Sequence, residues 1–301
     1  MTPADLHFQV DIAHWGWSIA WFLWFVGIAG MGSVAYYFVR KGVLSFVILG
    51  SLAIGLLFVV SHLGRWWNLP LTLWTMITNG IFNWSSWMLL GILMLSLHLV
   101  LTLVLVVAHL PWLQRLGWLR WTAALSRANA FVAAFALLGF GCTVYSGFLL
   151  TQAAGIPLWN TSLIPILWVV SGSIAAIAVL EILYVFGLVD ANVSSLGVRL
   201  GLGLDAVKLL AVLAFLHVAL SFGSAGARIG ATAMASGEYA LLTWGGVVGV
   251  GILVPLAIGA YTVLVKKSKL LLLVSAVAAL AGVYFLRAAV LLAGAWEPLV
   301  L

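Results

Sequence analysis

The sequence contains very little charge. Of its 301 residues, only 7% are Asp, Glu, Lys or Arg, whereas 65% are hydrophobic. A soluble globular domain carries roughly 25% charged residues, so this protein lacks the polar surface that such a domain needs. The shortage of charge excludes a soluble enzyme or binding domain and indicates an integral membrane protein.

Cysteine is almost absent as well. The single cysteine, Cys142, lies inside an apolar run. An iron–sulfur cluster or a disulfide framework needs several cysteines, so neither is expected within this sequence. A small buried side chain is the simplest interpretation of Cys142.

The sequence has long apolar runs instead. A membrane-spanning helix needs about 20 predominantly apolar residues, and eight runs reach that length. They are too long for the strands of a membrane barrel, which alternate over about ten residues. No connection is long enough for a soluble domain, so residues 1–301 are expected to form one all-α membrane domain. The predicted spans are about 17–39, 43–62, 85–109, 128–152, 163–188, 203–222, 241–265 and 270–293.

The basic residues are distributed unevenly between the two sides of these spans. Ten of the 13 Lys and Arg residues belong to one side, and only Arg65, Arg228 and Arg287 belong to the other. By the positive-inside rule, both termini are expected on the outer side of a cytoplasmic (inner) membrane that the protein crosses several times. The net charge of +6 is therefore a topology signal, and no nucleic-acid partner is expected.

Polar and aromatic residues gather near the predicted outer side. Trp and Tyr form interfacial belts in any membrane protein, so a single member of this layer means little. Arg287 is different because it lies inside an apolar run, where a charge costs several kcal/mol unless it is paired or functional. We therefore expect a binding site in this layer. Its candidate residues are His14, His62, Arg65, Tyr145, Trp159, Asn160 and Arg287.

A second polar group is predicted towards the cytoplasmic side. Asp205 and Lys208 are three residues apart and can meet on one helix face. The simpler interpretation is an intrahelical ion pair. The alternative is that both belong, with Glu181, to a proton path that leads to the outer layer.

The most specific motif in the sequence is a Tyr-x-Gly-x-Leu-Leu stretch followed by a Pro-x-Trp-Asn hairpin and a Leu-x-Pro helix start. It lies in YSGFLLTQAAGIPLWNTSLIPILWVVSGSIAA (145–176). Three further segments are WGWSIAWFLWFVGIAGMGS (15–33), SHLGRWWN followed by FNWSSWMLLG (61–68 and 82–91), and GVYFLRAAVLLAG (282–294). Together these segments resemble the NrfD/PsrC family of membrane subunits, found in polysulfide reductase and related respiratory complexes.

The resemblance implies a membrane anchor that oxidises quinol, or reduces quinone, near the outer membrane face. The quinone would be of the menaquinone or ubiquinone type, and no haem or iron–sulfur cluster is expected in this protein. The implied partners are a ferredoxin-like iron–sulfur subunit and a catalytic, molybdopterin-containing subunit such as a sulfur or polysulfide reductase. The whole complex could form a dimer, and membrane lipid surrounds the anchor.

The resemblance bears most directly on Tyr145, since the family carries a Tyr at that place in the fourth helix. His14 and His62 can supply further hydrogen bonds or accept a proton, with Asn160, Arg65, Trp159 and Arg287 as supports. No metal site is predicted. The sequence departs from the family at two positions, because His62 stands where Asp is common and Trp66 where Pro is common. The role of position 62 in proton release is therefore open.

Two other functions are compatible with parts of the sequence. A di-haem cytochrome b anchor needs His pairs on facing helices near both membrane surfaces, whereas the inner half offers only His98 and His109 on one helix. A secondary transporter would suit Glu181 and the many glycines, but the sequence shows no internal repeat with broken helices at matching positions.

Overall fold

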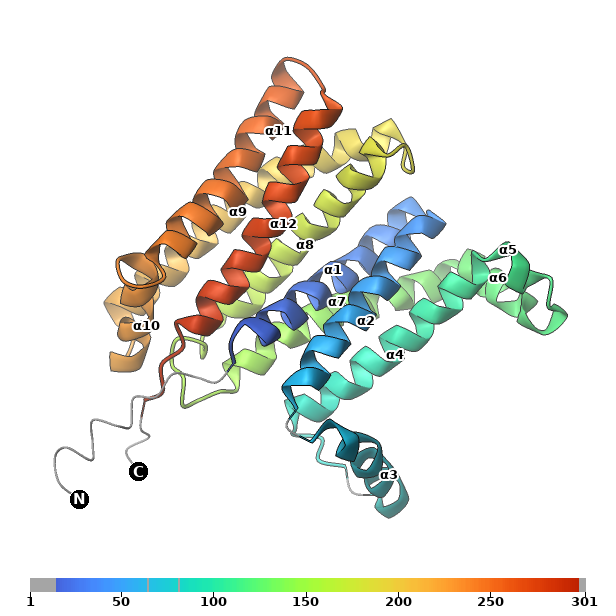
Figure 1. Ribbon diagram of the computed structural model, residues 1–301, viewed down its shortest axis with the longest axis horizontal. Helices are drawn as coiled ribbons and strands as arrows, with labels where there is room; N and C mark the ends of the chain where they lie inside the picture. The colour runs from blue at the N-terminus through green and yellow to red at the C-terminus, as the bar shows by residue number, and fades with distance from the viewer. Residues whose placement is uncertain (1–14, 64, 81, 298–301) are drawn as a thin grey trace.

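The computed structural model describes residues 15–63, 65–80 and 82–297 (Figure 1). These residues are mostly helical, and no β-strand occurs among them. Within these described ranges, eight helices are long and apolar enough to cross a membrane, as the sequence predicts. They are α1 (Trp17–Val39), α2 (Gly42–His62), α4 (Trp87–Ala108), α7 (Asn129–Thr151), α8 (Leu163–Val185), α9 (Ala191–Phe222), the continuous pair η4 (Leu241–Leu253) and α11 (Val254–Leu264), and α12 (Lys269–Leu292).

One span differs clearly from its predicted bounds. The other seven agree to within three residues at each end, but α9 begins at Ala191 instead of residue 203. Its first turns contain Ser194, Ser195 and Arg199, which lower the hydropathy without breaking the helix. The hydropathy of the sequence therefore locates only the apolar part of α9, and the helix is longer than this part.

The connections contain short helices that hydropathy does not predict. Helix α3 follows a 3₁₀ turn between α2 and α4, and α6 lies between α4 and α7. These pieces are too short to span a membrane. Their bounds are η2 (Trp66–Asn68), α3 (Leu69–Asn79), α5 (Pro111–Gln114), η3 (Gly117–Leu119), α6 (Arg120–Arg127) and α10 (Ala225–Ala235).

The spans pack as two groups of four. Helices α1, α2, α4 and α7 form one group, and α8, α9, α12 and the η4–α11 pair form the other (Figure 1). The groups join where α1 packs on α8 and α12, and where α7 packs on α8. Helix α1 is therefore central to the molecule, and more than half of its residues are buried.

The seventh span changes its helical winding midway. Its first half, η4, is a π-helix, and its second half is an α-helix that carries Pro255 at its start. Proline has no N–H, so Pro255 cannot donate to the carbonyl four residues earlier, which is that of Gly251. The ammonium group of Lys208 donates to this oxygen at 3.1 Å. A side chain of α9 thus compensates a backbone acceptor of the neighbouring span.

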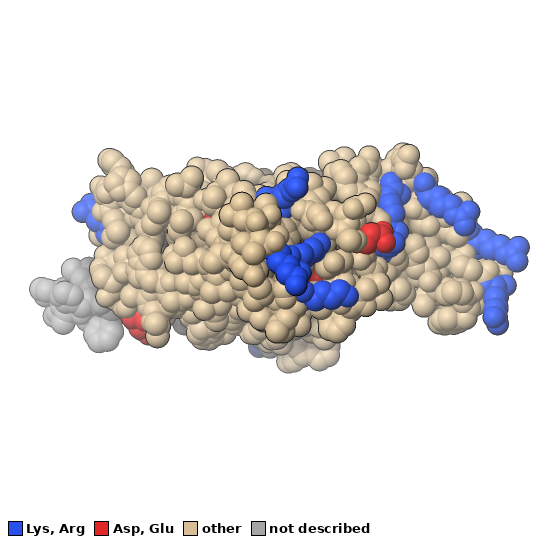
Figure 2. Space-filling view, turned by 90° about the horizontal axis from the view of Figure 1, so that it is seen from above, with Lys and Arg blue, Asp and Glu red and all other residues tan. Residues whose placement is uncertain are grey.

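The two ends of the bundle differ in charge. The hairpin of residues 152–162, which joins α7 to α8, lies at one end, called the hairpin end below. The opposite end, called the basic end, carries the α1–α2, α8–α9 and α11–α12 connections and the α5–α6 region. Most Lys and Arg side chains belong to it (Figure 2). Lys41 and Asp190 form an ion pair there at 3.0 Å, which joins the two groups of helices.

Candidate functional site

Tyr145 lies in the interface between α7 and α4, near the hairpin end. Only 6% of it is exposed, and its ring lies almost parallel to that of Trp87, with centroids 6.5 Å apart. The ring covers Gly91 so closely that a Cβ at that position would collide with the hydroxyl group. Glycine at position 91 therefore makes the space that the Tyr145 side chain occupies. Among the described residues, no hydrogen bond of the Tyr145 hydroxyl is found.

Trp159 fixes the 152–162 hairpin to the rest of the bundle. Its side chain is 1% exposed, and its indole N–H donates to the carbonyl of Val290 in α12 at 2.8 Å. Its ring stacks on Trp15, with centroids 5.7 Å apart and planes 29° apart. The backbone N–H of Glu297 also donates to the carbonyl of Gly155 in the hairpin at 2.9 Å. The hairpin is thus attached to the segment just before α1 and to the end of α12.

The other candidates at this end are more exposed. His62 is the last residue of α2, and its Nδ1 lies 3.2 Å from the hydroxyl of Ser18 in α1. Arg65 is exposed just beyond α2. Asn160 is also exposed, and it lines a cavity of about 290 Å³ between the hairpin and the α9–α10 region, on a different side from Trp87 and Gly91. His14 lies outside the described residues.

Arg287 is fully buried where α12 meets α8 and α1. Its guanidinium group donates to the hydroxyl of Ser171 at 3.1 Å and to the carbonyl of Val283 at 3.2 Å. It also lies over the ring of Trp168, 5.2 Å from the centroid. A Cβ on Gly27 would lie 2.6 Å from Nη2, so α1 provides the space for the charge. Nε and Nη2 have no partner among the described residues, which leaves donors for a further polar group.

The predicted outer candidates therefore do not form one contact cluster. Tyr145 belongs to the α4–α7 interface, Arg287 to α8–α12, and Asn160 to the α9 side of the hairpin. Helix α1 and the residues just before it contact three of the candidates: Trp15 lies beside Trp159, Ser18 beside His62 and Gly27 beside Arg287. The sequence predicted their shared depth but not this division among interfaces.

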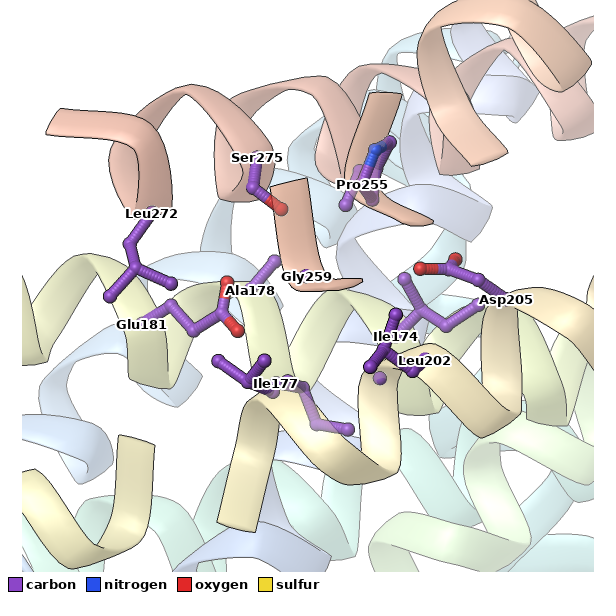
Figure 3. A pocket seen from close by; sticks show the side chains of 13 residues that line it. Ile174, Ile177, Ala178, Glu181, Leu202, Asp205, Pro255, Gly259, Leu272 and Ser275 are labelled. Atoms are coloured by element: carbon purple, nitrogen blue, oxygen red, sulfur yellow. The ribbon is translucent and has the colours of Figure 1, made fainter. Parts of the chain in front are cut away.

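The second polar group does come together, in the part of the bundle towards the basic end. Glu181 and Asp205 line one small cavity between α8, α9, α11 and α12, and their carboxylates and the hydroxyl of Ser275 point into it (Figure 3). Glu181 is 6% exposed and Asp205 is 4% exposed. The cavity has a volume of about 20 Å³, which is enough for one water molecule.

The expected ion pair between Asp205 and Lys208 does not form. Lys41–Asp190 is the one ion pair in the described part of the protein, and Lys208, fully buried, donates to the carbonyl of Gly251 instead. Oδ1 of Asp205 has no partner among the described residues. The predicted intrahelical contact between the two charged groups is therefore not found among the described residues, and Lys208 instead donates to an acceptor on the neighbouring span.

Two histidine pairs connect α4 to α1, and sequence reasoning missed both. Nε2 of His98 lies 2.7 Å from the hydroxyl of Ser33, and Nε2 of His109 lies 2.7 Å from that of Tyr36. His98 is fully buried and its Nδ1 has no partner among the described residues. The spacing of these four residues along their helices could have predicted the two pairs from the sequence. Ser33 and Tyr36 are one turn apart, and the two His residues are three turns apart, so each pair of side chains shares a helix face.

Metal ligation has no candidate cluster in the structure. Among the described residues, no three His, Cys, Asp or Glu side chains lie close enough together to bind a metal ion. Cys142 is free and buried in α7.

Comparison with known proteins agrees with this architecture. The sequence matches the family described as "Polysulphide reductase, NrfD" across residues 5–297. The protein belongs to the NrfD family. It is 29% identical to the C subunit of polysulfide reductase from Wolinella succinogenes, over 95% of this sequence and 96% of the relative. It is 26% identical to protein NrfD of Escherichia coli, over 95% of this sequence and 96% of the relative, and 27% identical to an NrfD homologue of Haemophilus influenzae, over 93% and 94%.

Family membership identifies the general role of the protein. It is a multi-pass NrfD membrane subunit of the kind found in polysulfide reductase-type oxidoreductase complexes. Such a subunit works with other subunits. At the hairpin end, the protein offers an aromatic pair of Trp87 and Tyr145 with an available hydroxyl, and Arg287 provides a buried charge. These are groups that can position a flat, polar-edged molecule and exchange a proton with it.

Proposed function

We propose that this NrfD protein is the quinone-interacting anchor of a respiratory oxidoreductase complex, and that it oxidises quinol or reduces quinone near the hairpin end. The family match over residues 5–297 carries the proposal. The relative named as the C subunit of polysulfide reductase supports a sulfur or polysulfide reductase as the type of complex. The protein would not be catalytically complete alone.

The chemistry of the hairpin end fits a quinone. Such a ligand needs a flat apolar slot, a donor for each carbonyl oxygen, and a group that takes or gives a proton. Trp87 and Tyr145 supply parallel rings, and the Tyr145 hydroxyl supplies a donor. His62 is a second titratable group at this end, and we propose that His14 is a third. When bound, a quinol supplies two electrons and two protons for each oxidation.

The remaining candidates have supporting roles in this proposal. Trp159 holds the hairpin against α12 and α1. Arg287 supplies positive charge beneath the site. Arg65 and Asn160 lie exposed at the same end, where they are available to a partner subunit. We propose that this partner is a ferredoxin-like iron–sulfur protein that passes electrons to a molybdopterin subunit, and that the whole complex can dimerise.

We further propose that the hairpin end faces the outer side of a cytoplasmic membrane. The concentration of Lys and Arg at the basic end supports this orientation by the positive-inside rule. Both termini would then lie outside, together with the quinone site and the partner subunits.

Glu181, Asp205 and Lys208 are proposed to form a proton path from the basic end towards the quinone site. Three observations support it. The two carboxyl groups share a water-sized cavity, the expected ion pair is absent from the described residues, and Lys208 lies in the next turn of α9 after Asp205. A cavity of about 150 Å³ lined by Arg199 and Lys267 lies at the basic end and shares Val198 with the inner cavity.

Purification in mild detergent from the native host tests the proposal. We expect an iron–sulfur protein and a large catalytic subunit to copurify, extractable quinone in the preparation, and reduction of the iron–sulfur centres on addition of quinol. A Soret absorption band would favour the di-haem cytochrome b alternative. A lone protein without quinone or redox partners would favour a transporter.

A further inference from the structure

A basic, open cavity lies at the end opposite the proposed quinone site. It has a volume of about 720 Å³ and lies where the ends of α1 and α4 meet α6 and the start of α7. Arg40, Arg127, His109 and Asn129 contribute its polar wall, and no carboxylate is among its lining residues. The proposed electron and proton chemistry uses none of these residues.

Arg40 is held rigidly in this wall. It is the residue after α1 and has a left-handed backbone conformation, with φ of 52°. Its Nε donates to the carbonyl of Tyr37 at 3.0 Å, Nη1 to that of Ser126 at 3.4 Å, and Nη2 to Oδ1 of Asn129 at 3.1 Å. A guanidinium group has five N–H donors, so two are left for a ligand. All three acceptors are neutral, so the positive charge is not compensated by them.

Arg127 and His109 add two more groups that suit an anion. Arg127 is exposed in the last turn of α6, and its side chain makes no hydrogen bond to a described residue. Nε2 of His109 is occupied by the hydroxyl of Tyr36, which leaves Nδ1 on the other edge of the ring. Arg side chains match phosphate geometry well because their N–H groups can bind two oxygens at once.

The surroundings of the cavity are apolar, so its ligand must be amphiphilic. Phe38, 76% exposed, lines the cavity beside Ala108. Helices α4 and α7, which border the cavity, also expose Val100, Leu103 and Leu137, and such apolar side chains suit lipid acyl chains. Three exposed tryptophans in the α5–α6 region, Trp112, Trp118 and Trp121, are typical of the membrane–water interface.

We propose that this cavity binds the phosphate group of an anionic phospholipid. Arg40 and Arg127 bind the phosphate, Asn129 and His109 lie beside it, and the acyl chains follow the exposed faces of α4 and α7. Basic pockets between membrane helices on the cytoplasmic side bind such head groups in other proteins. The bound lipid would connect α1, α4, α6 and α7 at the basic end, whatever reaction takes place at the hairpin end.

The experiment uses the full-length protein, purified in detergent and stripped of lipid, and measures its thermal unfolding and bound lipid by native mass spectrometry. Four proteins are compared: wild type, Arg40→Gln, Arg127→Gln, and Arg228→Gln as a control from the hairpin end. We expect phosphatidylglycerol to bind and stabilise wild type and Arg228→Gln. Binding should be several-fold weaker in Arg40→Gln and Arg127→Gln, and phosphatidylcholine should have little effect on any of them.

Inorganic phosphate at matched concentration separates the two possible sources of the phosphate group. If it stabilises the wild type as strongly as phosphatidylglycerol does, the ligand is free phosphate and the lipid is excluded. Equal binding of phosphatidylglycerol by all four proteins would overturn the site altogether. Arg127→Gln decides the question if Arg40→Gln fails to fold, because of the two only Arg40 donates hydrogen bonds to described residues.

Discussion

At the scale of single residues, burial separates the titratable groups that can react from those that hold the fold. Tyr145 and Arg287 are buried near the hairpin end, Arg287 has two nitrogens without a partner among the described residues, and Glu181 and Asp205 share a cavity in the other half. His62 is exposed at a helix end and is accessible without any movement of the bundle. Substitutions of single residues therefore provide the most direct test of the proposed proton chemistry.

Tyr145→Phe should lower quinol oxidation by the assembled complex by roughly 10-fold, because the ligand loses one hydrogen-bond donor. The ring keeps its stacking on Trp87, so membrane insertion and thermal stability should not change. Tyr261→Phe, in an exposed tyrosine of α11, is the matched control. Turnover equal to wild type in both variants would remove Tyr145 from the site.

Glu181→Gln should slow turnover and change its pH dependence, since the amide cannot carry a proton between the basic end and the quinone site. Rates measured over a pH series, with protein stability measured beside them, provide the test. Glu238→Gln, which alters an exposed carboxylate at the hairpin end, should behave like wild type. A loss of stability with an unchanged pH profile would show that Glu181 has a structural role instead.

His109 should make the stability of the basic end depend on pH. Burial lowers the pKa of His109, which lies just beyond the end of α4. The unfolded state therefore binds a proton at a higher pH, near 6.5, than the folded state does. The contribution of His109 to stability should be fully present above that value and should be lost as the pH decreases towards the lowered pKa of the folded state. Thermal unfolding between about pH 8 and about pH 5 should show a smaller decrease for His109→Gln than for wild type.

At the scale of elements, the apolar composition of the sequence predicts the membrane-spanning helices, but it does not predict which helices and side chains pack against one another. The charge of Arg287 inside an apolar run predicts a buried functional or paired group, and the structure confirms the burial. That Ser171 and Trp168 are its neighbours depends on how α8 packs against α12, which no local pattern encodes. Asp205 and Lys208 illustrate the converse, since helix spacing predicts a direct contact between them, whereas Lys208 donates to the carbonyl of Gly251 on another span.

The short helices and the long α9 also show that local sequence patterns predict only part of the structure. Helix α3 is neither long nor strongly apolar, so a search for spans does not find it. In α9 the serines and Arg199 hide the first turns of a continuous helix. Tyr145 was predictable as a candidate because the resemblance to a family includes its motif. Its parallel packing on Trp87 over Gly91 was not, because it depends on contact between α4 and α7.

Trp159→Phe should loosen the hairpin between α7 and α8. The variant keeps an aromatic ring beside Trp15 but loses the hydrogen bond to Val290, which costs about 1 kcal/mol. We expect a lower unfolding temperature in detergent and weaker retention of the partner subunit during purification. Trp112→Phe, at an exposed position in α5, should change neither quantity. Equal behaviour of the two variants would contradict a structural role of Trp159.

At the scale of the whole molecule, the two ends have different properties. The hairpin end carries the candidate quinone residues and few basic side chains, and the basic end carries most of the Lys and Arg residues. Lipid-facing helices lie between them. This polarity connects the proposed orientation, the docking of partner subunits and the proposed phospholipid site in one arrangement.

Single introduced cysteines should reveal that arrangement in cells. Cys142 is fully buried, so it contributes little background labelling. A membrane-impermeant maleimide should label Asn160→Cys in intact cells, and Lys266→Cys only after the membrane is permeabilised. The opposite pattern would invert the proposed orientation and place the quinone site on the cytoplasmic side.

The position of Arg287 also bears on how the protein is made. The translocon delivers α12 to the lipid after the other seven spans, and an exposed guanidinium group would oppose its partition there by several kcal/mol. The groups that receive this side chain, Ser171 and Gly27, belong to α8 and α1, which are synthesised earlier. Integration of α12 into the membrane should therefore require that α1 and α8 are already packed together. The charge that we propose for the mature site would thus also act during biogenesis, by preventing the integration of α12 in molecules whose earlier helices are misplaced.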